Sequence, residues 1–218
     1  KIMKAVAFDK LSANTKLRLG SVRNLTGARW VWQPKLDGCY MAVFVKHGRV
    51  VKTTSRTGEI VHSMQHVADE LKAAVRRSGE QGEFVLIGEA WNPLNSFQEI
   101  SGMFRRHSNA PLLHFYVHDL VGTVDGKIAD SLLSYQTRYS IAASVIADAE
   151  FCYTVTYDLV GRTDPVEAAQ QLVEHGGHDG LIIRDQHAGY TLGPVKNGEI
   201  IKVKPNMSLD LKVIAVNE

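Results

Sequence analysis

The chain has 218 residues, of which 44% are apolar, and a formal net charge of +2. A chain of this length and composition can bury a substantial core, in one domain or in one domain and part of a second. The small net charge does not indicate a polyanion partner, so binding of nucleic acid would need a local basic surface. The two cysteines, Cys39 and Cys152, lack the spacing of a zinc site or a disulfide framework. They are typical of a reducing compartment.

No apolar run approaches the roughly 20 residues that a membrane span needs, and the N-terminus lacks the pattern of a signal peptide. We therefore expect a cytoplasmic protein with no membrane partner. Without heptads or a broad apolar stripe, a monomer is the default. The chain starts at Lys1, and residues 209–216 still have a strand pattern where it stops. These ends lead us to expect a fragment, or a chain cut at a domain edge.

The first half of the chain predicts strands and one long helix. An apolar stretch at 30–32 is followed by a hairpin with strands at 41–45 and 50–54. Residues 62–77 have apolar side chains at helical spacing and charges on the other face, which predicts an amphipathic helix. Runs rich in β-branched and aromatic residues predict strands at 84–91 and 112–121, with a short helix at 96–106 between them.

The second half predicts helices at 132–147 and 165–175, the latter with Asp164 as N-cap and Pro165 in its first turn. Strands are predicted at 151–159, 181–184 and 200–203. Helices and hairpins alternate without a strict βαβ order. The sequence therefore predicts an α+β fold of antiparallel sheets flanked by helices.

A Lys-x-Asp-Gly motif, Lys35-Leu36-Asp37-Gly38, follows the first apolar stretch. An amine at a strand end can attack a phosphorus atom and form a covalent nucleotidyl intermediate. An ordinary lysine has a pKa near 10.4, so a neighbouring cation or metal is needed to make it a nucleophile. Lys202 and Lys204 alternate on a strand and share one face. They are suited both to that task and to holding phosphates.

Further motifs follow in a fixed order, and each is weak evidence when taken alone. They are Ser55-Arg56-Thr57-Gly58, an apolar run that ends at Glu89, the aromatic strand 114–119, the run from Asp179 to Arg184, and Lys202-Val203-Lys204-Pro205. In this order the set resembles the nucleotidyltransferase motifs of ATP-dependent DNA ligases, particularly the small bacteriophage and bacterial type. The resemblance extends over nearly the whole chain.

The resemblance implies an ATP-grasp-like nucleotidyltransferase domain at 1–207 and the start of a truncated OB-fold domain at 208–218. It implies that Lys35 attacks the α-phosphorus of ATP, holds AMP covalently and passes it to the 5′-phosphate of nicked duplex DNA, with Lys202 and Lys204 assisting. Such enzymes serve DNA replication, repair and recombination, here in a bacterial cell or a phage-infected host. A complete enzyme would also need the missing OB-fold domain.

The resemblance also assigns contacts to the nucleotide and the metal. Gln33 would contact the base, and His118 occupies the position of a stacking aromatic, a role that Tyr116 could share. Arg56 would bind ribose or phosphate, and Glu89 the ribose or the metal. Asp179 would join Glu89 in holding Mg²⁺ or Mn²⁺. Purely structural roles at strand ends and turns stay open for all of these residues.

The sequence departs from the family pattern at two positions, and the role of two arginines in binding DNA is undecided. The first motif usually closes with Arg, but its sixth residue here is Tyr40, and the family more often has Glu where Asp179 stands. Arg105 and Arg106 are candidate contacts to DNA phosphates, or simply arginines at a solvated helix C-terminus. Three alternatives remain: an RNA ligase, a capping guanylyltransferase, and a non-catalytic nucleotide or nucleic-acid binding module. Of the two enzymes, the guanylyltransferase is the less favoured.

Overall fold

The computed structural model describes residues 2–16, 29–159, 164–195 and 198–205. Its helices include η1 (Phe8–Lys10), α2 (Gln65–Ser78), α3 (Phe97–Phe104), α4 (Tyr135–Val145) and α5 (Pro165–Gly176). Its strands are β1 (Met3–Lys4), β2 (Val6–Ala7), β3 (Trp30–Pro34), β4 (Cys39–Lys46), β5 (Arg49–Thr54), β6 (Glu83–Trp91), β7 (His114–Val124), β8 (Lys127–Ile128), β9 (Cys152–Thr154), β10 (Asp158–Leu159), β11 (Leu181–Asp185), β12 (Gly193–Pro194) and β13 (Ile200–Val203).

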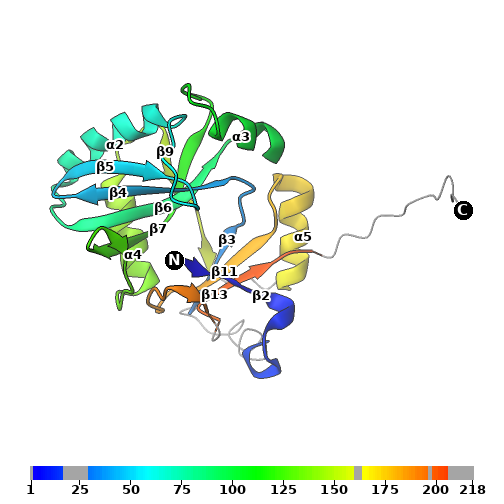
Figure 1. The fold of residues 1–218 in the computed structure, drawn as a ribbon. Coiled ribbons are helices and arrows are strands. Elements are labelled where there is room, and N and C mark those ends of the chain that lie inside the picture. Colours follow the sequence, from blue (N-terminus) through cyan, green and yellow to red (C-terminus); the bar gives the residue numbers. More distant parts are fainter. Residues whose placement is uncertain (1, 17–28, 160–163, 196–197, 206–218) are drawn as a thin grey trace, which may run out of the picture.

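Two main sheets form the molecule, and a small pair, β1 and β12, accompanies them (Figure 1). The larger sheet has the order β5-β4-β6-β7-β8, with β9 beside β7, and the five-stranded sheet has the order β10-β3-β11-β13-β2. Most neighbours are antiparallel; β7 with β9, β13 with β2, and β1 with β12 are parallel. Helices flank both main sheets, so the predicted α+β class is confirmed.

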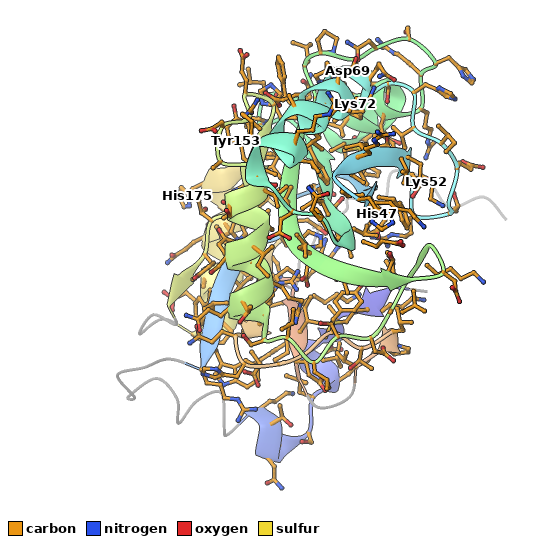
Figure 2. All side chains as sticks on the ribbon, turned by 90° about the vertical axis from the view of Figure 1, so that its left-hand side faces the viewer. His47, Lys52, Asp69, Lys72, Tyr153 and His175 are labelled. Atoms are coloured by element: carbon orange, nitrogen blue, oxygen red, sulfur yellow. The ribbon has the colours of Figure 1, made fainter. Side chains whose placement is uncertain are left out.

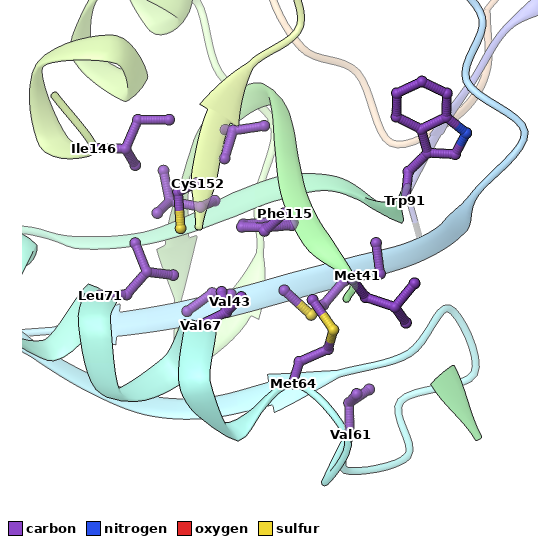
Figure 3. Close-up of a cluster of buried hydrophobic side chains, with 14 of the residues drawn as sticks. Met41, Val43, Val61, Met64, Val67, Leu71, Trp91, Phe115, Ile146 and Cys152 are labelled. Carbon is purple, nitrogen blue, oxygen red and sulfur yellow. The ribbon is translucent and has the colours of Figure 1, made fainter. Parts of the chain in front are cut away.

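The outer face of the larger sheet packs against α2 and α4 and forms the main hydrophobic core. Alternate residues of β4, such as Met41 and Val43, point to this side and meet Met64, Val67 and Leu71 at the helical layer (Figure 3). These side chains have essentially no exposure. The opposite side of α2 is polar, where Asp69 and Lys72 form an exposed ion pair of 2.7 Å (Figure 2).

A second core lies between the five-stranded sheet and α5, where Ala169 meets Leu181 and Ile183 of β11. Residues at alternate positions on these strands turn the other way, toward the larger sheet. We call the sheet faces that turn toward each other the inner faces. The inner face of the larger sheet has an apolar cluster of its own, which includes Tyr40 and Ile87.

Most predicted elements are confirmed, with shifts at their ends. The Asp164 side chain caps α5 by accepting from Val166 N at 2.8 Å. One expectation is wrong: residues 151–159 form two short strands in different sheets, because β9 pairs with β7 and β10 with β3. The strand expected at 209–216 and the OB-fold start expected at 208–218 lie outside the described residues. No helix in the described ranges has the length and apolar character needed to cross a lipid bilayer.

Candidate active site

Lys35 follows the last residue of β3 and is fixed by backbone pairing with the start of β11. Its N–H donates to the Gly180 carbonyl at 2.9 Å, and its carbonyl accepts from the N–H of Asp179 at 2.8 Å. The antiparallel pairing of β3 with β11 therefore brings the first motif and the Asp179 motif together, although 144 positions separate them.

Two lysines share the Asp179 carboxylate. Lys35 Nζ donates to Oδ2 and Lys204 Nζ lies 2.8 Å from Oδ1. Burial would raise the pKa of Asp179, but the hydrogen bonds from Lys204 and Lys35 outweigh burial, so the pKa is lowered. Lys202 pairs with Ile182 on β11, two residues before Lys204, and its side chain makes no hydrogen bond or ion pair with the described residues. Two of the three predicted cations, Lys35 and Lys204, thus meet on Asp179 at one end of the five-stranded sheet.

Glycines allow the close contacts that build this corner. A Cβ at Gly180, where φ is +131°, would lie 2.3 Å from the Val203 carbonyl oxygen of β13. A Cβ at Gly38 would lie 2.7 Å from the Ala90 carbonyl oxygen of β6. Both approaches are shorter than a side chain permits. The glycine in each motif therefore serves strand packing next to the reactive residue.

Glu89 lies on the inner face of the larger sheet, directly opposite Tyr40 on β4 and Tyr116 on β7. Burial raises its pKa to about 7, while the charges of Arg56 and Lys35 act in the opposite direction. Within the described ranges its carboxylate has no hydrogen bond or ion pair. Glu89 is half-buried, and withdrawing a carboxylate from water without a partner is costly, which makes Glu89 suited to an incoming donor or cation.

Tyr40, which stands where the first motif usually has Arg, has a cation nearby. The Arg56 guanidinium lies over the Tyr40 ring at 5.4 Å from its centroid, in the turn after β5. Such a contact is a cation–π interaction. Arg56 is exposed, whereas Tyr40 is 9% exposed and its hydroxyl has no hydrogen-bond partner among the described residues. A positive charge therefore stands beside Glu89 even though the motif lacks its usual arginine.

A divalent metal would find two candidate carboxylates here, Glu89 and Asp179. No group of three or more His, Cys, Asp or Glu side chains arranged for a metal occurs among the described residues. Mg²⁺ often takes only one or two protein carboxylates and completes its shell with water and substrate phosphates. The unpartnered Glu89 fits such an ion, whereas Asp179 would have to release a lysine to bind one.

A β-bulge in β7 determines how the predicted stacking residue lies. The register shifts between Ile87, which pairs with Asp119, and Gly88, which pairs with Val117, so His118 is the extra residue. A bulge re-aims side chains locally. His118 Nδ1 lies 3.2 Å from Arg184 Nη2, and burial with the Arg184 charge lowers the His118 pKa to about 3. Its ring is therefore neutral at physiological pH.

Tyr116, the alternative stacking residue, belongs to a row of rings. It lies 5.1 Å from Trp91 in an edge arrangement and 5.3 Å from Tyr153. Trp91 in turn lies 5.5 Å from His178, the neighbour of Asp179. This row of rings thus extends from His178, beside Asp179, across β6 and β7 to β9.

A buried charged network, which the sequence reasoning missed, connects the two sheets. Asp119 of β7 is 1% exposed and pairs with Arg138 of α4 at 2.8 Å and with Arg184 of β11 at 3.3 Å. Gln33 joins it: its Oε1 accepts from Arg184 Nε at 2.8 Å, and its Nε2 donates to the Val155 carbonyl at 3.1 Å. The one signal in the sequence was the arginine that closes an otherwise apolar run at 181–184.

Three further predicted residues are one buried glutamine and two exposed arginines. Gln33 is 1% exposed, so a contact to a base stays a prediction. Arg105 and Arg106 follow α3 and are exposed. Arg105 is near enough to Cys39 to lower the pKa of that thiol, although burial leaves it raised. Arg105 is thus placed beside Cys39, the residue that follows the first motif.

Comparisons with known proteins identify the family and the fold of the chain. Residues 10–204 match the family model described as the ATP dependent DNA ligase domain. A DNA ligase of Thermococcus onnurineus is 27% identical over 86% of this chain and 34% of its own length. The chain thus spans about a third of that relative.

Solved structures share the fold. The structure named Pmar-Lig_PreS3 has a TM-score of 0.74 at 19% identity and covers 94% of this chain and 46% of its own. The ATP-dependent DNA ligase of bacteriophage T7, in complex with ATP, has a TM-score of 0.64 at 18% identity and covers 94% of this chain and 68% of its own. The family model matches most of the chain, and this chain therefore belongs to the family of ATP-dependent DNA ligase domains.

Proposed function

We propose that this chain is the adenylation part of a DNA ligase and that Lys35 forms a covalent bond with AMP. The observation that carries the proposal is the shared carboxylate: Lys35 and Lys204 meet on Asp179 at the end of β3 and β11. A nucleophilic nitrogen and a second cation then stand together where a triphosphate would be attacked. The residues around them are the ones that the family motifs supply.

The reaction is an in-line displacement at phosphorus. The Lys35 nitrogen forms a bond to the α-phosphorus of ATP, and the bond from that phosphorus to the bridging oxygen breaks. Pyrophosphate leaves with the electron pair. The Lys35 ammonium must give up one proton before attack, and the new P–N nitrogen loses another. Lys202 and Lys204 would neutralise the phosphate charges as these bonds change.

Asp179 holds the nucleophile until ATP arrives. Its two bonds fix the position of Nζ, and charge-assisted bonds of this kind are strong and directional. When the α-phosphate takes over Lys204, the carboxylate is left with Lys35 alone. Asp179 therefore acts as a positioning residue in this proposal, besides any contact to a metal.

The nucleotide would lie against the inner faces of the two sheets. Glu89 and Arg56 would contact the ribose and phosphates, and His118 or Tyr116 would stack on adenine. Glu89 and Asp179 would hold Mg²⁺ or Mn²⁺, which supplies charge neutralisation at the phosphate oxygens. Nicked duplex DNA would lie beside Arg105 and Arg106.

Several finer assignments extend the proposal. The activity of a complete ligase would need a following OB-fold domain, and residues 1–207 would be the nucleotidyltransferase domain. The two free cysteines support a reducing, cytoplasmic setting for DNA replication, repair and recombination. We expect this 218-residue chain to work as a monomer, and to seal nicks poorly by itself.

The test is covalent labelling with α-labelled ATP and a divalent metal. The wild-type chain should retain acid-labile label after denaturation, and γ-labelled ATP should give none. Lys35→Ala should abolish the label. Lys52→Ala is the matched control, because Lys52 lies on β5 over the Phe44 ring, and it should label normally. An unlabelled wild-type chain would support a non-catalytic binding module instead.

The nucleic-acid substrate needs a separate experiment. The labelled protein is offered nicked DNA duplex and nicked RNA duplex, and transfer of AMP to the 5′-phosphate is measured. We expect transfer to DNA to be faster. Transfer to RNA alone would establish an RNA ligase of the same superfamily.

A further inference from the structure

Arg184 bonds to both predicted adenine contacts, Gln33 and His118. Its Nε donates to Gln33 Oε1 at 2.8 Å, and its Nη2 lies 3.2 Å from His118 Nδ1. Its Nη1 is 3.3 Å from Asp119 Oδ2. Arg184 is 5% exposed, and the Tyr135 ring lies 4.6 Å from its Cζ. The guanidinium is therefore held from several sides.

The chemistry of arginine makes these contacts directional. A guanidinium has N–H donors and no acceptor, and it stays protonated in proteins. His118 Nδ1 must therefore accept, which leaves the ring proton on Nε2. Gln33 must present its carbonyl oxygen to Arg184, in agreement with the bond from its Nε2 to the Val155 carbonyl. One cation thus determines a histidine tautomer and an amide orientation.

The bulge in β7 makes this arrangement possible. In a regular strand, consecutive side chains point to opposite faces, so His118 and Asp119 could not both reach one guanidinium. The extra residue at His118 changes that alternation. Gly88 permits the bulge, because a Cβ there would lie 2.2 Å from the Tyr116 carbonyl oxygen. The local irregularity is thus matched to the position of Arg184.

We propose that Arg184 is a positioning residue for adenine recognition: it fixes His118 as the Nε2–H tautomer and orients the Gln33 amide. The inference rests on the proposed function, because it assumes that His118 and Gln33 face the base. Arg184 itself would not contact ATP. It acts through its two neighbours.

The first test is nitrogen NMR on protein labelled in its histidine rings, with His118 assigned by the signals that disappear in His118→Phe. The wild-type spectrum should show Nε2 protonated and Nδ1 unprotonated at neutral pH. A proton on Nδ1 would overturn the proposal directly. This measurement needs neither a variant at Arg184 nor any catalysis.

Variants give the second test. Arg184→Lys keeps a buried cation but loses the planar guanidinium that bonds Gln33 and His118 together. We therefore expect the KM for ATP in self-adenylation to rise about tenfold, with a smaller change in the rate of self-adenylation at saturating ATP. Arg138→Lys is the matched control: Arg138 pairs with the same Asp119 but bonds neither Gln33 nor His118. It should leave the KM and the His118 tautomer unchanged.

The two proposals fail in different ways. An equal rise of the KM in Arg184→Lys and Arg138→Lys would show that Arg184 only stabilises the fold. A wild-type chain that never takes up AMP would overturn the proposed function. The tautomer measurement would still test by itself whether Arg184 fixes His118. Arg184→Met adds a stricter variant, and an unchanged His118 tautomer in it would overturn the inference.

Discussion

Lys35 and Asp179 are joined twice, once through their side chains and once through their backbones. Lys35 Nζ donates to Asp179 Oδ2, and the Asp179 N–H donates to the Lys35 carbonyl at 2.8 Å. The backbone bond continues the pairing of β3 with β11. The strand register thus sets where the side-chain pair forms. The predictions below follow from this corner and from the groups around it.

Asp179→Asn should slow self-adenylation by at least about tenfold, because Lys35 loses a charge-assisted bond that places its nitrogen. The fold should be little affected, by about 1 kcal/mol or less, since the pair is partly exposed to solvent. Single-turnover labelling and urea unfolding measure the two effects. Asp69→Asn, which breaks the exposed pair on α2, is the control. Labelling of Asp179→Asn at the wild-type rate would contradict this account.

Gly180→Ala should lower the free energy of unfolding by about 2–4 kcal/mol. The added Cβ would meet the Val203 carbonyl oxygen, and the φ of +131° is strained for any side chain. Gly102→Ala is the matched control: it lies in α3 with nothing within 4 Å of the new Cβ, so it should gain about 0.5–1 kcal/mol. Denaturant unfolding measures the free energy of unfolding of both variants. Equal changes in Gly180→Ala and Gly102→Ala would refute the close contact at Gly180.

Glu89→Gln should stabilise the protein in a pH-dependent way. The folded pKa of about 7 lies above the ordinary 4.5, so the folded state holds more protons between these values and stability falls as pH rises through them. The variant should therefore exceed wild type by about 1–3 kcal/mol at pH 8 and lose that gain near pH 4. A gain of the same size at both pH values, measured by urea unfolding, would be inconsistent with a raised pKa of Glu89. Glu80→Gln, at an exposed position, should show no such trend.

Replacing both Arg105 and Arg106 with Ala should weaken binding of nicked DNA. The slope of the logarithm of the binding constant against the logarithm of the salt concentration should become shallower by the amount expected for about two phosphate contacts. Arg76→Ala removes an exposed arginine from the last turn of α2 and should leave the salt slope unchanged. The slope is obtained from binding titrations over a range of salt concentrations. An unaltered slope in the double variant would assign these arginines to a solvated helix end.

Sequence reasoning found the corner because local patterns and strand order determine it. Lys35, Asp179 and Lys204 each lie at the end of an apolar strand, and antiparallel pairing of those strands brings them together. The buried network was not predictable in this way. Arg138 lies in α4 and Asp119 beside a bulge, and their meeting depends on packing between elements that no short pattern encodes. The split of 151–159 into β9 and β10 is a similar tertiary effect.

The most direct test of the central claim is the mass of the peptide that carries AMP. The chain is incubated with ATP and a divalent metal, digested under conditions that preserve a P–N bond, and examined by tandem mass spectrometry. The account predicts one adenylyl group, on the peptide that contains Lys35 and on its side-chain nitrogen. Adenylyl on Lys202 or Lys204 instead, or on no lysine at all, would contradict it.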